Sequence, residues 1–143
     1  TIMLTILALA LAGCSASGSP TPQGTSPEPT PSRTISFQAQ TVAGGGVVVV
    51  VKPLNPALGK PLEFNVVMDS HSVEIVEDMV AAVVLRDSDG REYQPSAWEG
   101  SGPGGHHRSG VLKFAALTSP TKQVELVVRD VAGVPERLYR WDL

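Results

Sequence analysis

After residue 34, the chain is a succession of short apolar runs, rich in β-branched residues and closed by Gly, Pro, Asp or Asn. Runs of this kind, spaced roughly every 8–15 residues, are typical of antiparallel sheets. The pattern predicts an all-β domain over residues 35–143, an immunoglobulin-like antiparallel β-sandwich of about seven or eight strands. The expected strands are residues 35–42, 47–52, 62–68, 80–86, 91–94, 111–116, 123–129 and 137–141.

Two segments of this domain can be interpreted in more than one way. Val73, Val76 and Val80 fall at helical spacing, so residues 73–82 are also compatible with a helix. Residues 87–90, Asp-Ser-Asp-Gly, resemble part of a calcium-binding loop, but no glutamate follows at the spacing that such a loop requires. We interpret them as a tight hairpin turn, in which glycine accepts a positive φ.

A short apolar stretch, residues 2–12, precedes Cys14, which is the only cysteine of the chain. It is too short to cross a membrane, which takes a helix of roughly twenty apolar residues. The run Leu-Ala-Gly-Cys at 11–14 resembles the lipobox of bacterial lipoprotein signal peptides, in which the cysteine is acylated and becomes the first mature residue. The resemblance implies a signal peptide at 1–13, palmitate-type acylation of Cys14, and a membrane-anchored, extracytoplasmic lipoprotein of the cell envelope.

An ordinary cleaved signal peptide with an incidental cysteine is the alternative for this segment. The basic residues with which signal peptides begin do not precede it, so we expect the natural start to lie upstream of Thr1. Residues 15–34 are mainly Ser, Thr, Pro and Gly. They have too few apolar side chains for hydrophobic burial to offset the conformational entropy lost on ordering them. They are predicted to be a disordered linker, extended by proline at roughly 3.1 Å per residue.

Composition narrows the possible partners of the domain. The net charge of -3 and the pI near 5.5 argue against nucleic acid and against an anionic lipid surface as binding partners. A protein partner stays open. Since Cys14 is the only cysteine, the domain has no internal disulfide and depends on packing for its stability.

The histidines are the residues that most suggest a binding function. Because consecutive antiparallel strands alternate in direction, every second loop emerges at the same end of a sandwich. This alternation predicts that all three histidines share one end, together with several acidic residues and Met79. The loops expected at that end are residues 69–79, 95–110 and 130–135.

Imidazole is the commonest side-chain ligand of transition metals, and it suits Cu, Zn or Ni. We expect His71 and one residue of the pair His106-His107 to be ligands, with Asp69 or Asp130 as a further ligand or as a group that orients a histidine. The sequence therefore predicts a binding protein for copper or zinc. The competing interpretation is a surface interaction module without metal, in which the same side chains brace the loops or contact a protein or glycan.

An enzyme is a third possibility, and would need an open metal position with a general base such as Glu99. No Ser-His-Asp, Cys-His or phosphate-loop arrangement can be built from the sequence. Trp98 and Trp141 are expected to pack in or around the core, although either could stack on a sugar. The charged residues on either side of residues 131–135 are expected to pair and fix that short loop.

Four motifs between residues 68 and 141 resemble those of a family of uncharacterised prokaryotic secreted or lipid-anchored proteins. The resemblance implies the same cellular location and no particular activity. The overall plan is also similar to small periplasmic β-sandwich copper carriers, whose methionine-rich motifs this chain lacks. The motifs are Met-Asp-Ser-His-Ser at 68–72, Trp98 with Gly-Gly-His-His-Arg-Ser-Gly at 104–110, Arg-Asp-Val-Ala-Gly-Val-Pro-Glu-Arg at 129–137, and Tyr-Arg-Trp at 139–141.

Overall fold

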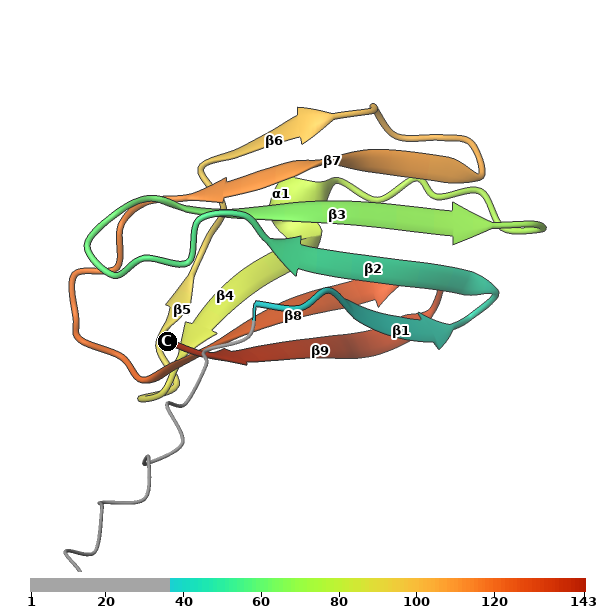
Figure 1. Ribbon diagram of the computed structural model, residues 1–143. Helices are drawn as coiled ribbons and strands as arrows, with labels where there is room; N and C mark the ends of the chain where they lie inside the picture. Colours follow the sequence, from blue (N-terminus) through green and yellow to red (C-terminus); the bar gives the residue numbers. More distant parts are fainter. Residues whose placement is uncertain (1–36) are drawn as a thin grey trace, which may run out of the picture. The chain divides into compact units, whose positions relative to one another are not determined.

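The computed structural model describes residues 37–143, which form two antiparallel β-sheets facing each other (Figure 1). One sheet has the strand order β1-β2-β3-β7-β6 and the other β5-β4-β8-β9. The predicted antiparallel β-sandwich is confirmed. The predicted signal peptide at 1–13, Cys14 and the predicted linker at 15–34 lie outside the described residues. The elements are β1 (Gln40–Gly44), β2 (Val47–Pro53), β3 (Leu62–Ser70), α1 (Met79–Ala82), β4 (Val83–Asp87), β5 (Glu92–Tyr93), β6 (Ala97–Gly100), β7 (His107–Phe114), β8 (Gln123–Val131) and β9 (Val134–Asp142).

The sandwich forms because side chains alternate between the two faces of each strand. In β3, every second residue from Leu62 to Ser70 is buried, and the residues between them are half-buried. In β9, Arg137, Tyr139 and Trp141 are buried while their neighbours are exposed. Each sheet therefore presents one continuous inner face, and the two inner faces pack into a single core.

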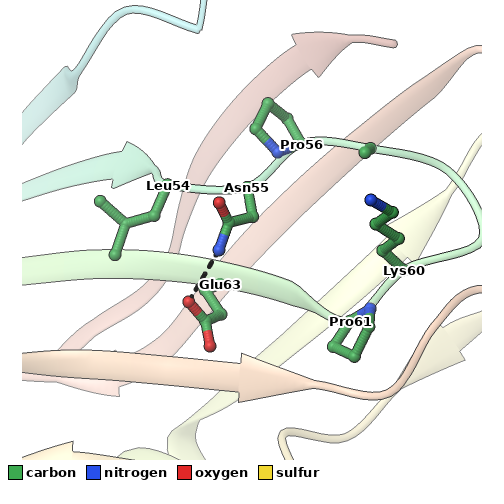
Figure 2. A pocket seen from close by; sticks show the side chains of 7 residues that line it. Leu54, Asn55, Pro56, Lys60, Pro61 and Glu63 are labelled. Carbon is green, nitrogen blue, oxygen red and sulfur yellow. Dashed lines mark hydrogen bonds between the residues drawn. The ribbon is translucent and has the colours of Figure 1, made fainter.

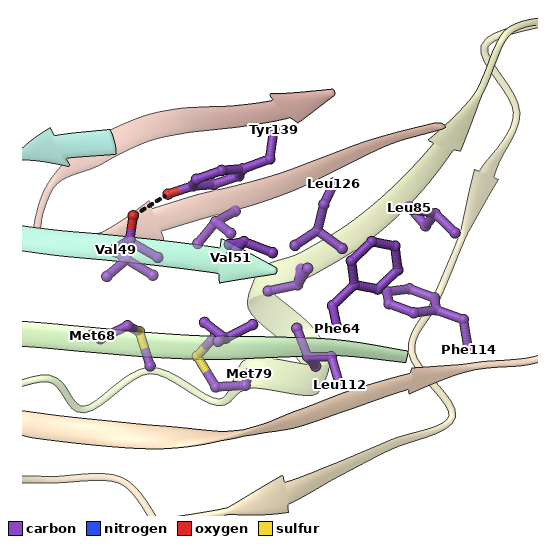
Figure 3. Close-up of a cluster of buried hydrophobic side chains, with 14 of the residues drawn as sticks. Val49, Val51, Phe64, Met68, Met79, Leu85, Leu112, Phe114, Leu126 and Tyr139 are labelled. Atoms are coloured by element: carbon purple, nitrogen blue, oxygen red, sulfur yellow. Dashed lines mark hydrogen bonds between the residues drawn. The ribbon is translucent and has the colours of Figure 1, made fainter. Parts of the chain in front are cut away.

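Aromatic rings organise one half of that core (Figure 3). Phe64 meets Phe114 edge to face with ring centroids 5.7 Å apart, and its ring lies 5.5 Å from that of Trp141. The Tyr139 hydroxyl crosses between the sheets and donates a hydrogen bond of 3.1 Å to the Val49 carbonyl. This bond satisfies the one polar atom of a ring that is otherwise fully buried, so it links the sheets without a desolvation penalty.

The strand boundaries depart from the sequence prediction in several places. β7 begins at His107 rather than at residue 111, so His107 lies in a strand and not in the predicted loop at 95–110. The structure has nine strands in the described part of the chain, one more than predicted, because residues 97–100 form β6 at the edge of the larger sheet. The strand expected at 80–86 begins only at Val83, since residues 79–82 form the one-turn helix α1. Asp78 caps this helix by accepting a hydrogen bond of 2.9 Å from the backbone N–H of Val80.

The predicted turn at residues 87–90 is confirmed as the hairpin between β4 and β5. Gly90 has a φ of 81°, and its N–H donates to the Asp87 carbonyl at 3.0 Å. The ion pairs expected beside residues 131–135 are confirmed in part. Arg129 pairs with Glu136 at 3.3 Å, whereas Arg137 is buried and donates to backbone carbonyls.

The loops gather at two ends of the sandwich (Figure 1). We call the first the histidine end; its loops are residues 45–46, 71–78, 101–106 and 132–133. We call the second the leucine end, after exposed Leu54 and Leu58; its loops are residues 54–61, 88–91 and 115–122. Within residues 37–143, no helix is long and apolar enough to cross a membrane.

Candidate functional site

At the histidine end, the loop at 71–78 is joined to the loop at 101–106 by backbone hydrogen bonds. Ile75 donates to the Gly105 carbonyl at 2.9 Å, and its own carbonyl accepts from Gly104 at 2.8 Å. Ser70, the last residue of β3, donates to the His106 carbonyl at 2.8 Å. All three histidines therefore lie at one end of the sandwich, where the alternation of strand direction predicted them.

His107 and Asp69 form the closest polar pair of this end. They are directly opposed on β7 and β3, and His107 Nδ1 lies 2.6 Å from Asp69 Oδ1. Their inward neighbours Met68 and Arg108 are buried, so the pair lies on the outer face of the larger sheet, with both side chains exposed. An ionised carboxylate only accepts hydrogen bonds, so Nδ1 carries the hydrogen. In the neutral ring, Nε2 then keeps its lone pair for another partner.

His106 is held differently. Its Nδ1 lies 2.9 Å from the carbonyl oxygen of Val73, in the neighbouring loop. A carbonyl oxygen also only accepts, so this ring donates from Nδ1 and fastens residues 71–78 to the start of β7. His106 and His107 thus have different partners, a backbone carbonyl of the loop at 71–78 and the Asp69 carboxylate. The expectation that only one of the two is a metal ligand stays a prediction.

The other predicted residues of the site are more dispersed. His71 is exposed, two residues beyond Asp69 on the chain that continues β3. Asp130 is exposed near the β8–β9 turn of the opposite sheet and has a φ of 55°. Met79, expected beside the histidines, is instead buried in the core, which removes its thioether from the surface. In the described part of the chain, no three His, Cys, Asp or Glu side chains converge as a metal would need.

A buried polar brace that was not predicted from the sequence lies beneath these loops. The Arg108 guanidinium, only 2% exposed, donates to the carbonyls of Glu77 at 2.7 Å and of Ile75 and Ser101 at 3.3 Å. Burial lowers the pKa of Arg108, and the charge of the Glu77 carboxylate opposes that effect. Arg108 thus carries a positive charge under the loop that follows β3, and fixes that loop through backbone oxygens.

A second buried arginine supports the same end from the other sheet. Arg137 donates to the Val131 carbonyl at 2.8 Å and to the Gly44 carbonyl at 2.7 Å. The Glu77 carboxylate accepts a hydrogen bond of 2.9 Å from the backbone of Ala132. The alternation pattern contained the signal for both arginines, because Arg108 and Arg137 fall in phase with the buried residues of β7 and β9.

The fold and the site together describe a β-sandwich protein with an exposed histidine–carboxylate pair at one end. The loops of that end are held by the buried side chains of Arg108 and Arg137. No known family model matches the sequence, and neither does any curated protein. The chain is similar in structure to MPT63, a secreted protein from Mycobacterium tuberculosis, with 17% sequence identity and a TM-score of 0.45. The similarity covers 74% of this chain and 92% of that one. At this level it carries no argument about function.

Proposed function

We propose that this protein is a membrane-anchored extracytoplasmic binding protein that takes up a copper or zinc ion at its histidine end. The observation that carries the proposal is the hydrogen bond of 2.6 Å from His107 Nδ1 to Asp69 Oδ1. A carboxylate that accepts from Nδ1 fixes the ring and its tautomer and makes Nε2 more basic, which is how metal-binding histidines are commonly supported. In this proposal, His107 is a ligand and Asp69 orients it.

His71 supplies the second imidazole. It follows Asp69 by two residues, in the loop at 71–78 just beyond the end of β3, and so lies at the same end of the sandwich as His107. Both rings are exposed, so an ion could reach them from solvent and complete its coordination with water. Two imidazoles suit Cu(II) or Zn(II) better than the hard cations, which prefer oxygen ligands. We expect weaker binding than at sites with three or four protein ligands, because fewer protein donors are preorganised.

Metal content and affinity test this proposal directly. The full chain, purified without a polyhistidine tag, is dialysed against copper or zinc, and bound metal is counted per chain. We expect about one ion per chain, lost in His107→Ala and in His71→Ala but retained in the matched control His106→Ala. Less than about a tenth of an ion in the unaltered chain would reject the proposal, as would full metal content in His107→Ala.

The membrane anchor is proposed on Cys14 alone. Several acyl chains on one cysteine, each contributing about 0.8 kcal/mol per buried CH₂, would hold the protein on a membrane. When a bacterial host is fed a labelled fatty acid, the label should appear in the full chain and not in Cys14→Ser. Label in both proteins, or in neither, would remove the anchor from the proposal.

A second candidate function is a surface interaction module without metal. The bond from His106 Nδ1 to the Val73 carbonyl favours it, because this ring is used for bracing. In that case, copper and zinc leave the thermal unfolding temperature of the full chain unchanged. A metal bound at the histidine end would instead raise that temperature as the metal concentration increases.

A further inference from the structure

The leucine end has an unusual concentration of exposed apolar side chains. Two of the five large hydrophobic residues that are exposed in the described part of the chain, Leu54 and Leu58, belong to its loop at 54–61, at 43% and 48% exposure. The same loop contributes Pro56 to the wall of an open hollow of about 670 Å³ (Figure 2). The other three, Val48, Val76 and Leu138, lie apart in the sequence, whereas Leu54 and Leu58 share one short loop, which makes this loop a candidate contact surface.

The leucine end also has three exposed lysines. Lys60 lies within the loop at 54–61, Lys52 lies near the end of β2 just before that loop, and Lys122 lies in the loop at 115–122. None of them is in an ion pair within residues 37–143. Most carboxylates of this end have an ion-pair partner: Asp87 and Asp89 lie against Arg91, and Glu63 lies 4.0 Å from Lys113. Asp142 keeps its negative charge, since its hydrogen bond of 3.2 Å comes from the neutral amide of Gln123.

The two ends of the sandwich therefore differ in charge. The exposed acidic side chains Asp69, Glu74 and Asp130 lie at the histidine end. The net charge of -3 predicts no attraction to an anionic surface, but that value is an average over the chain. An anionic surface would attract the leucine end and repel the histidine end, which would orient the domain.

The chain also enters the domain at the leucine end. β1 starts at Gln40 and runs toward the histidine end, so residues 37–39, which precede it in the described part of the chain, lie at the opposite one. Trp141 Nε1 donates to the Gln38 carbonyl at 2.9 Å and holds the entering chain there. A lipid on Cys14 would therefore be connected to the domain through this end.

We infer that the leucine end is a docking surface for the bilayer in which Cys14 is anchored. The inference rests on the lipid anchor of the proposed function. Leu54 and Leu58 enter the interface between headgroups and acyl chains, and the three lysines extend to the phosphates of anionic lipids. A weak contact is enough, because a tethered domain meets the surface at high effective concentration. Docking turns the histidine end, with its Asp69–His107 pair, away from the membrane.

The experiment measures which end approaches the lipid. The lipidated full chain is reconstituted on vesicles of phosphatidylcholine with about 30% phosphatidylglycerol, an anionic lipid. A fluorophore is attached through Ala57→Cys at the leucine end or through Glu74→Cys at the histidine end, both of which are exposed positions. Lipids brominated in their acyl chains quench a fluorophore that lies at the interface. Co-sedimentation with the vesicles, compared with Cys14→Ser, reports anchoring separately.

We expect quenching at residue 57 to exceed that at residue 74 by at least about twofold. The double variant Leu54→Asp/Leu58→Asp should abolish the difference, whereas Val76→Asp, at an apolar residue of the other end that is 57% exposed, should leave it unchanged. Equal quenching of the two labels in a chain that sediments overturns the docking surface and leaves the anchor intact. A chain that does not sediment overturns both, and metal content measured on the same samples tests the histidine end independently.

Discussion

The Asp87 carboxylate holds the turn between β4 and β5 by accepting three hydrogen bonds. The backbone N–H groups of Asp89 and Arg91 donate to Oδ1, and the Tyr93 hydroxyl donates to Oδ2, each at 2.9 Å. Burial by itself raises the pKa of Asp87, but these hydrogen bonds and the charge of Arg91 outweigh it, so its pKa lies below the ordinary value of 3.8. The ionised form is thus stabilised by folding. Its contribution is present above pH 3.8 and is lost as pH falls through the lowered pKa.

Asp87→Asn is therefore expected to lower the free energy of unfolding at pH 7 by about 1–2 kcal/mol. The difference from the unaltered chain should shrink as pH falls from 3.8 through the lowered pKa of Asp87, below which the native carboxyl also becomes neutral. Urea unfolding at a series of pH values measures both effects. Asp89→Asn is the matched control, because its carboxylate is exposed and only approaches Arg91 at 3.5 Å. A penalty for Asp87→Asn that is independent of pH would contradict the assignment.

The histidines should differ in what they contribute to stability. His106→Ala removes the bond to the Val73 carbonyl and is expected to cost about 0.5–1.5 kcal/mol. His107→Ala removes an exposed pair with Asp69 and is expected to cost at most about 0.5 kcal/mol in metal-free solution. Chemical denaturation of both variants with a chelator present measures the difference. Equal losses would mean that His106 does not brace the loop at 71–78.

The alternation of strand direction explains in part which residues of the histidine end could be predicted. This pattern predicted one shared end for the three histidines, although the structure departs from it at β5 and β6, which follow each other and both run toward the histidine end. It could not reveal that His106 bonds to Val73, because the path of an irregular loop depends on tertiary contacts. Arg108 was overlooked because residues 95–110 were predicted to be a loop, where a charged side chain is expected to face solvent. The structure instead places Arg108 in β7, where backbone carbonyls of the loops satisfy it.

At the scale of elements, β6 and β7 approach closely because two glycines face each other. Gly100 and Gly110 are cross-strand partners, and the Trp98 ring covers them at the sheet edge. A Cβ on Gly110 would lie 2.6 Å from the Gly100 Cα and 2.7 Å from both the Glu99 carbonyl oxygen and the Trp98 ring. Two of these neighbours are backbone atoms, which cannot move aside without disturbing the ladder. An aromatic side chain laid over glycine is a recognised way of stabilising such an edge.

Gly110→Ala is therefore expected to destabilise the domain by about 1–3 kcal/mol. Gly102→Ala is the matched control, because a Cβ there meets nothing within 4 Å and the backbone does not have a positive φ. Thermal and urea unfolding of the two variants give the comparison. If Gly110→Ala were as stable as Gly102→Ala, the close packing of β6 on β7 would be wrong.

The same glycines explain why β6 escaped prediction. Residues 97–100, Ala-Trp-Glu-Gly, have no apolar alternation, and their glycine is depleted in strands. Only pairing with β7 and the fit of Trp98 make them a strand. The bounds of the one-turn helix α1 were also not predictable. The spacing of the valines at 73, 76 and 80 indicates a helix in this region, but local spacing does not decide where a helix ends and β4 begins.

At the scale of the whole molecule, the two-layer architecture was predictable and the function only in part. Alternation and turn residues define a sandwich whatever the exact strand order, because an apolar face has to be buried against another layer. The charge difference between the two ends was not predictable from composition, because the net charge of a chain does not say where its charged residues lie in the fold. Lysines such as Lys60 and carboxylates such as Glu74 are separated only once the strands are assembled.

Residues 37–143, the described part of the chain, pack around one hydrophobic core. The only cysteine of the chain, Cys14, lies outside them, so their stability depends on noncovalent packing alone. We therefore expect residues 33–143 to unfold in one cooperative transition that a reducing agent does not change. Deleting residues 1–32 should shift the unfolding temperature by less than about 4 °C, which for a domain of this size corresponds to under about 1 kcal/mol. Calorimetry of both proteins in the same detergent measures this. A shift larger than this would show that the preceding segment contributes to the stability of the sandwich. Two transitions would show that the histidine end and the leucine end do not belong to one cooperative core.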